Sequence, residues 1–254
     1  MVAISFDNVS KEYRGNREQG FLSREILARL FRRRPKRGTV AALKGVNFCV
    51  QSGEKVGVIG SNGSGKSTML SLAAGTTYPS SGTVEVHGRI GPLLQLGAGF
   101  HHPLTGRENV ILNAALLGMQ KHEILPQVES ILDYADIGVS ADAAVSTYSS
   151  GMVARLGFAV LAHMKPDVLL VDEALSVGDA RFRMKCEATI NQLFAGGTTI
   201  LLVSHSLNTV RRICDRVIWL ERGTLIMDGP VDEVLDAYDA FSKRNATNNP
   251  AQKA

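Results

Sequence analysis

The chain has 254 residues, of which 44% are hydrophobic and 20% charged, with a formal net charge of +4. This composition is typical of a soluble globular protein and gives no apolar run near the about 18 residues that a membrane-spanning helix needs. The N-terminal residues lack the basic and apolar regions of a signal peptide. The three cysteines are far apart and lack metal-ligand spacing, so we expect reduced thiols in a cytosolic protein.

The positive charge is concentrated in one segment. Residues 14–37 hold nine Lys and Arg against two Glu, a net of +7, so the rest of the chain carries 4 − 7 = −3. Apolar residues within 20–34 recur at helical spacing among these basic residues. We therefore predict a basic amphipathic insertion at about 14–38. In one interpretation, residues 20–34 form a helix that contacts the inner-membrane surface or an acidic partner loop. In the other, they form a flexible charged insertion. Both interpretations stay open.

Strands alternate with helices along the remainder of the chain. This alternation predicts an α/β fold with a doubly wound, mostly parallel sheet. A polar tail over 242–254 is expected to be disordered. The predicted strands cover 4–9 (ending near residue 13), 46–50, 55–59, 83–86, 168–171, 198–203, 216–220 and 224–227. The predicted helices cover 66–74, several stretches of 104–139, and 152–163, 181–194, 206–213 and 231–241.

A glycine-rich loop lies between the predicted strand 55–59 and the predicted helix 66–74. It matches the pattern G-x-x-x-x-G-K-S, in which backbone N–H groups and a helix N-terminus surround phosphate oxygens. Lys66 is expected to reach the β- and γ-phosphates, and the Ser67 hydroxyl to coordinate Mg²⁺. The predicted nucleoside triphosphate site comprises Gly60, Ser61, Asn62, Gly63, Ser64, Gly65, Lys66, Ser67 and Thr68.

Two carboxylates close the apolar strand predicted at 168–171. Asp172 is placed to hold Mg²⁺ through water, and Glu173 to polarise the attacking water as a general base. Upstream of them, Ser149-Ser150-Gly151 forms a turn directly before an apolar helix. A phosphate loop by itself indicates only nucleotide binding, whereas this combination indicates nucleotide hydrolysis.

With these motifs in this order, the chain resembles the nucleotide-binding subunit of ATP-binding-cassette (ABC) transporters over about residues 4–238. The resemblance implies a phosphate-loop NTPase fold with a mostly parallel core sheet, an N-terminal antiparallel β subdomain and an inserted helical subdomain at about 100–163. The ATPase domain would then span 1–241. In this family the turn formed here by Ser149, Ser150 and Gly151 contacts the nucleotide held by a second copy of the chain, which implies a head-to-tail homodimer.

The resemblance also assigns roles to single residues. Tyr13 matches the aromatic residue that stacks on adenine, and Gln95 matches the glutamine loop, which also contacts the metal. His205 matches the switch histidine, and Asp179 matches the aspartate of the loop after the acidic pair. The implied catalytic residues are thus Glu173, His205, Gln95 and Asp179, and the implied metal ligands are Ser67, Gln95 and Asp172. The implied ligands are ATP and Mg²⁺, and the implied partner is an integral membrane permease.

Two motifs, the turn at 149–152 and the loop at 176–179, depart from the usual family sequence and point to one branch. Ser150 stands where a glycine is common, Met152 where a glutamine is common, and Ser-Val-Gly-Asp replaces Ser-Ala-Leu-Asp at 176–179. Together with residues 93–109, these variants resemble ATPases that export bacterial surface polysaccharides such as O-antigen, capsule or teichoic acid. That resemblance implies a peripheral protein at the cytoplasmic face of the inner membrane, with the polysaccharide contacted mainly by the permease and no nucleic-acid partner. The alternatives are an importer, a lipid or drug exporter, or a non-transport cassette ATPase.

Overall fold

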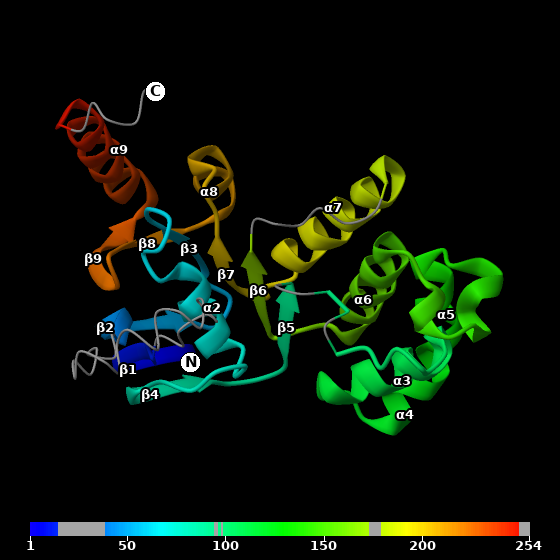
Figure 1. Cartoon of the computed structure of the whole chain (residues 1–254). Helices are drawn as coiled ribbons and strands as arrows, with labels where there is room; N and C mark the ends of the chain where they lie inside the picture. The colour runs from blue at the N-terminus through cyan, green and yellow to red at the C-terminus, as the bar shows by residue number, and fades with distance from the viewer. Residues whose placement is uncertain (15–38, 94–95, 98, 173–178, 249–254) are drawn as a thin grey trace, which may run out of the picture.

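The computed structural model describes residues 1–14, 39–93, 96–97, 99–172 and 179–248 (Figure 1). The predicted basic insertion at about 14–38 falls outside the described residues apart from its first position, Arg14. Gln95, Glu173 and most of the Ser176–Asp179 loop also lie outside them. Helices and strands keep the labels of Figure 1 below.

A three-stranded antiparallel sheet forms the N-terminal part of the molecule, as the family resemblance predicts. Its order is β2-β1-β4, with β1 spanning Val2–Arg14, β2 Thr39–Gln51 and β4 Ser81–Val86. Strand β2 begins well before the predicted strand 46–50, and β1, predicted over 4–9 with its end near residue 13, runs from Val2 to Arg14. The reason is that the two strands continue to pair as a two-stranded ribbon as far as Arg14 and Thr39. These residues lie beyond those whose alternating apolar pattern predicts a strand.

The second sheet is the predicted mostly parallel core. Its order is β5-β6-β7-β3-β8-β9, and only the pair β8 and β9 is antiparallel. The bounds are β3 Lys55–Ile59, β5 Ile90–Leu93, β6 Val168–Asp172, β7 Thr199–Val203, β8 Arg216–Glu221 and β9 Thr224–Pro230. Every residue of β7 is buried, as expected for a strand covered on both faces.

Strand β5 was not predicted from the sequence. It contains Gly91-Pro92, a pair that normally marks a turn. The strand forms because it is the edge of the sheet and pairs only with β6. At an edge, the missing N–H of proline leaves no ladder bond unmade.

Helices cover both faces of the core sheet. Helix α2 (Lys66–Ala73) packs between the two sheets, in one hydrophobic core with residues of β1, β2, β3 and β8. Helices α7, α8 and α9 cover the opposite face, in a second core. Their bounds are Ala180–Ala195, Leu207–Ile213 and Val231–Asn248.

The helix at the C-terminal end is longer than predicted. It runs to Asn248, whereas the sequence pattern placed its end at 241 and a disordered tail from 242. Residues 242–248 contain neither glycine nor proline, so nothing in them stops a helix that has already begun. The expectation for residues 242–248 is therefore corrected, and residues 249–254 lie outside the described part of the chain.

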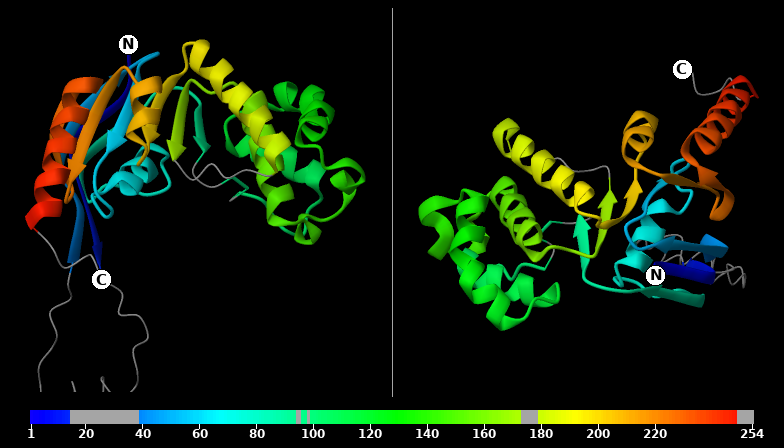
Figure 2. Two further views of the ribbon diagram at one scale, coloured as in Figure 1. Left: turned by 90° about the horizontal axis from the view of Figure 1, so that it is seen from above. Right: turned by 180° about the vertical axis from the view of Figure 1, so that it is seen from behind.

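A helical region projects from the sheet beyond β5 and β6 (Figure 2). It has a hydrophobic core of its own, to which α3, α5 and α6 contribute Val110, Ile131 and Leu156. Helix α6 also places Phe158 and Leu161 in the core under the sheet, which fixes the region to the sheet. The helices are α3 Gly106–Leu116, α4 Lys121–Ile124, α5 Val128–Ala135 and α6 Ser150–Met164, with 3₁₀ turns at Leu125–Gln127, Gly138–Asp142 and Val145–Thr147.

Among the described residues, no helix is long and apolar enough to cross a membrane. The three cysteines are free thiols, and Cys186 and Cys214 are buried. Loss of solvation on burial raises the pKa of both buried thiols to about 12, so they are protonated at neutral pH.

Candidate functional site

The phosphate loop connects β3 to α2, and two of its glycines are required by its path. Gly60 has φ 147°, and a Cβ there would lie 2.0 Å from the carbonyl oxygen of Leu220. Gly65 has φ 110°, and a Cβ there would lie 2.5 Å from the carbonyl oxygen of Ala42. Any side chain at either position would force the loop away from the neighbouring backbone. The sequence pattern therefore specifies a loop of this one shape.

Lys66 folds back over this loop. Its side chain is buried, and its Nζ donates hydrogen bonds to the carbonyl oxygens of Gly60 (2.8 Å) and Ser61 (2.9 Å). No side chain caps the N-terminus of α2, because the N-cap residue is Gly65. The helix thus presents uncapped N–H groups and its positive end beside an ammonium group, an arrangement that favours an anion. The exposed Ser67 hydroxyl lies in the first turn of the same helix.

The turn between β8 and β9 is hydrogen-bonded to the phosphate loop and supports it. Ser61 Oγ donates to Glu221 Oε1 (2.9 Å), and the backbone N–H of Gly223 donates to the carbonyl oxygen of Ser64 (2.9 Å). Ser64 is buried against this support. Because these contacts hold the loop in place, its N–H groups are oriented before any phosphate arrives. The sequence motif gives no sign of Glu221 or Gly223, which lie about 160 positions further along the chain.

Asp172 and His205 lie at the same edge of the sheet as the phosphate loop. Strands β3, β6 and β7 are parallel, and Asp172 is in register with Val203, the last residue of β7. His205 follows two residues later and is exposed. Since the carboxyl ends of parallel strands meet at one edge, Asp172 at the end of β6 and the His205 loop after β7 share the edge at which the phosphate loop follows β3. Hydroxyl and carboxylate oxygens such as those of Ser67 and Asp172 are ligands that suit Mg²⁺.

Tyr13 lies in the antiparallel sheet, near the end of β1, where it pairs with Val40 of β2. Tyr13 is 44% exposed. The ammonium group of Lys11 lies over the ring, 5.1 Å from its centroid. The exposed ring therefore has the accessibility that stacking on a base requires.

The Ser149-Ser150-Gly151 turn begins α6. Ser149 is the N-cap residue, and its Oγ accepts a hydrogen bond from the backbone N–H of Met152 (3.2 Å). Ser149 and Ser150 are exposed, and the atom nearest to a Cβ built at Gly151 would be Ser149 Oγ at 3.8 Å. The turn is thus open to solvent at the positive end of a 15-residue helix.

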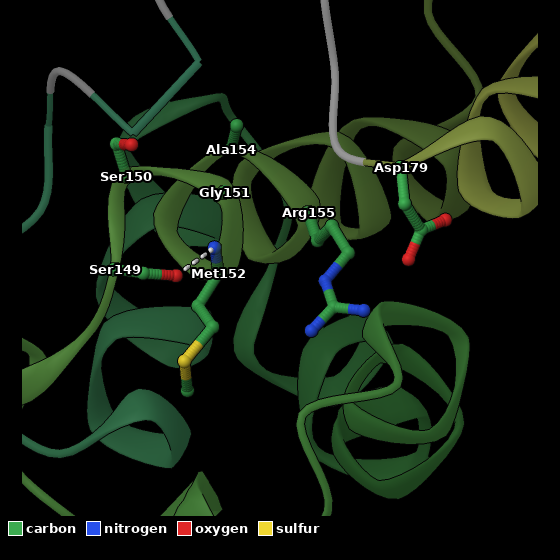
Figure 3. A pocket seen from close by; sticks show the side chains of 7 residues that line it. All are labelled: Ser149, Ser150, Gly151, Met152, Ala154, Arg155 and Asp179. Carbon is green, nitrogen blue, oxygen red and sulfur yellow. Dashed lines mark hydrogen bonds between the residues drawn. The ribbon is translucent and has the colours of Figure 1, made fainter.

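Asp179 faces the same open space as this turn. It is the N-cap of α7, where its Oδ1 accepts from the backbone N–H of Phe182 (2.9 Å). A pocket of about 470 Å³ separates the two helix N-termini (Figure 3). Arg155 contributes to its wall, a role that the sequence motifs did not indicate. The pocket is lined by Ser149, Ser150, Gly151, Met152, Ala154, Arg155 and Asp179.

The described site residues therefore form two separate groups within one chain. The first group is the phosphate loop with Asp172 and His205, at the edge of the core sheet. The second is the Ser149-Ser150-Gly151 turn, called the signature turn below, together with Asp179, at the helical region. Figures 1 and 2 show α2 and α6 on opposite sides of β6 and β7. Each group includes exposed residues, such as Ser67 in the first and Ser149 in the second.

Asn109 holds the loop that leads into the helical region. The residue is fully buried in α3. Its Oδ1 accepts from the backbone N–H of His101 (2.7 Å), and its Nδ2 donates to the carbonyl oxygens of His101, Leu104 and Thr105 at 2.9–3.1 Å. One side chain thus satisfies four backbone groups of residues 101–105. It fixes the segment that follows the glutamine loop.

Replacing Asn109 by leucine is expected to destabilise the fold by about 1–3 kcal/mol, because the substitution removes four side-chain hydrogen bonds, including the partner of the His101 backbone N–H. The denaturant midpoint of the full chain measures this loss. Asn208→Leu, at an exposed position of α8, is the matched control and should change stability by less than about 0.5 kcal/mol. Equal stability of the two variants would contradict the role assigned to Asn109.

The chain resembles known proteins over most of its length. A family model described as ABC transporter matches residues 43–176. The chain is 42% identical to the O-antigen export system ATP-binding protein RfbB of Klebsiella pneumoniae, over 92% of this chain and 96% of that protein. It is also 42% identical to the teichoic acids export ATP-binding protein TagH of Listeria monocytogenes serotype 4b, over 95% of this chain and 71% of that protein.

Solved structures show the same fold. One is a dimeric ATP-binding cassette in a post-hydrolysis state bound to ADP and Pi, with a TM-score of 0.65 and 24% identity, over 90% of this chain and 98% of that chain. Another is an ATP-binding subunit of an ABC transporter, with a TM-score of 0.69 and 21% identity, over 93% of both chains. At these identities the likeness supports the fold and the placement of its elements.

Proposed function

The chain belongs to the ABC transporter family, and from that premise we propose that it is the ATP-hydrolysing subunit of an exporter that moves a bacterial cell-surface polysaccharide across the inner membrane. The observation that carries the ATPase assignment is the separation of two preformed half-sites in one chain. The phosphate loop and the signature turn each lie at a helix N-terminus, and each includes residues that are exposed to solvent. The substrate class is supported by the names of the relatives, which are O-antigen and teichoic acid export proteins.

The phosphate loop binds ATP by exchanging internal contacts for phosphate contacts. The Lys66 ammonium releases the carbonyl oxygens of Gly60 and Ser61 and donates to β- and γ-phosphate oxygens instead. Ser67 and Asp172, with Gln95, would hold Mg²⁺, which neutralises charge on the phosphates. Glu173, directly after Asp172, accepts a proton from the attacking water.

The second half-site belongs to another copy of the chain. Two copies close head to tail, so that α6 of one copy directs its N-terminus at the γ-phosphate held by the phosphate loop of the other. The Ser149 hydroxyl and the backbone at Gly151 supply donors there, and Asp179 lies beside them at the same contact. His205, at the edge of the sheet, faces the γ-phosphate from the phosphate-loop side. Hydrolysis removes the group that both copies bind, and the dimer reopens.

The proposed partner is a separate membrane permease at the cytoplasmic face of the inner membrane. Residues 101–105, which Asn109 fixes, lie in the connection from β5 to the helical region, and this position suits transmission of the nucleotide state. The basic residues of 20–34 suit contact with anionic headgroups beside that permease. The polysaccharide is then handled mainly by the permease.

Deleting the gene in its own host is expected to remove a surface polysaccharide and leave its lipid-linked precursor inside the cell. The wild-type chain should restore export and Lys66→Met should not, because the methionine has no donor for phosphate oxygens. Immunoblots of surface glycan and isolation of the chain from membranes with its bound integral protein provide the measurement. A chain isolated in a soluble complex with nucleic acid, from cells whose surface glycans are unchanged by the deletion, would support a non-transport ATPase instead.

A further inference from the structure

The end of β1 is fastened to the loop between α2 and β4. The backbone N–H of Ser80 donates to the carbonyl oxygen of Ser10 (2.8 Å), and the backbone N–H of Glu12 donates to Ser80 Oγ (3.0 Å). Lys11 adds two more bonds, from its Nζ to Thr77 Oγ1 (3.0 Å) and to the carbonyl oxygen of Tyr78 (2.7 Å). This corner therefore connects the strand that carries Tyr13 with the helix that begins at the phosphate loop.

Lys11 also covers one face of the Tyr13 ring. Its Nζ is 5.1 Å from the ring centroid, within the range of a cation–π interaction. The ammonium is not a loosely placed surface charge, because Thr77 and Tyr78 already fix its position. Tyr13 as a whole residue is 44% exposed, so a planar group can approach it from solvent. A group fixed on one face of a ring limits the orientations that the ring samples.

We propose that Lys11 is a positioning residue for the nucleotide base: it fixes the Tyr13 ring on one face so that the base stacks on the other, at a set position relative to the phosphate loop. This inference rests on the proposed function, because it takes ATP as the ligand. It adds a residue that contacts neither the phosphates nor the base. The alternative is a purely structural role, in which Lys11 only stabilises the contact between β1 and the α2–β4 loop.

A comparison of ATP with inorganic triphosphate separates these roles. Triphosphate offers the phosphate loop the same kind of contacts but has no base. Steady-state ATP hydrolysis by the full-length protein gives kcat and KM for ATP, and competition gives the inhibition constant of triphosphate. The variants are Lys11→Met, Lys11→Arg, Tyr13→Ala and the control Lys121→Met, at an exposed position of α4. Denaturant midpoints of all four variants monitor the fold.

Lys11→Met is expected to raise KM for ATP about three- to tenfold, the range that a cation–π contact and its geometry allow. The kcat at saturating ATP and the inhibition by triphosphate should stay within about twofold of the wild type, and Lys11→Arg should restore KM. Lys121→Met should change none of these values.

Three results would overturn the proposal. If Lys11→Met leaves KM unchanged while Tyr13→Ala raises it, the base stacks on Tyr13 without help from Lys11, and the proposed function stands. If Lys11→Met weakens triphosphate inhibition as much as ATP binding, Lys11 acts on the fold or on the phosphates. An unchanged KM in Tyr13→Ala would overturn the base site itself, and with it the role of Lys11.

Discussion

Replacing Glu173 by glutamine is expected to lower ATP turnover by about 10²–10⁴-fold, the contribution of a positioned general base. Glu173 directly follows Asp172, the last residue of β6, and β6 ends at the edge of the sheet that also carries Gly60 and His205. Glutamine keeps the size and hydrogen-bonding reach of the side chain but does not accept the proton of the attacking water. The variant should bind ATP as tightly as the wild type.

The same variant should accumulate as an ATP-dependent dimer, because the γ-phosphate that joins the two copies is no longer removed. Size-exclusion chromatography with and without ATP, together with release of phosphate in a single turnover, measures both effects. Glu187→Gln, at an exposed position of α7, is the control and should behave as the wild type. Turnover by Glu173→Gln within tenfold of the wild type would refute its assignment as the base.

Gly151→Asp is expected to reduce turnover by about 10²–10³-fold without harming the fold, the loss that follows removal of one preorganised donor site. In the isolated chain there is room for a side chain, since the nearest atom to a Cβ at this position is 3.8 Å away. A carboxylate in the first turn of α6 is also favourable for the helix. The damage therefore arises only when the γ-phosphate of another copy approaches this helix end and meets a negative charge.

This prediction is checked by three measurements on Gly151→Asp. The denaturant midpoint and the affinity for ATP should match those of the wild type, while steady-state hydrolysis is lost. Gly151→Asn has nearly the same shape without the charge, so it should retain more activity than the aspartate variant. Equal losses in both variants would mean that space, not charge, decides the effect.

The parts of the fold that the sequence predicts are those set by local pattern. The phosphate loop is an example, because its glycines and Lys66 lie within nine residues between an apolar strand and a helix. The antiparallel and parallel sheets also agree with the prediction. Strand β5 was missed because Gly91-Pro92 is acceptable there only at a sheet edge, and edge position is a property of the assembled sheet.

The contacts that shape the site were not predictable in the same way. Ser61 meets Glu221, and Lys11 meets Thr77 and Tyr78, only because distant strands and loops are brought together. Likewise, Ser149 and Asp179 share a pocket because α6 and α7 pack against each other, with the rings of Phe158 and Phe182 in contact (6.2 Å between centroids). The spacing of these residues along the chain does not predict which of them come into contact in the fold.

The central claim is that each ATP is hydrolysed between the phosphate loop of one copy and the signature turn of another. Mixing two inactive variants, Lys66→Met and Gly151→Asp, tests it directly. In a mixed dimer one site carries both defects and the other carries neither. An equal mixture should therefore recover about a quarter of the wild-type activity per chain, since half of the dimers are mixed and each has one intact site. No recovery, in a mixture shown to contain mixed dimers, would contradict the claim.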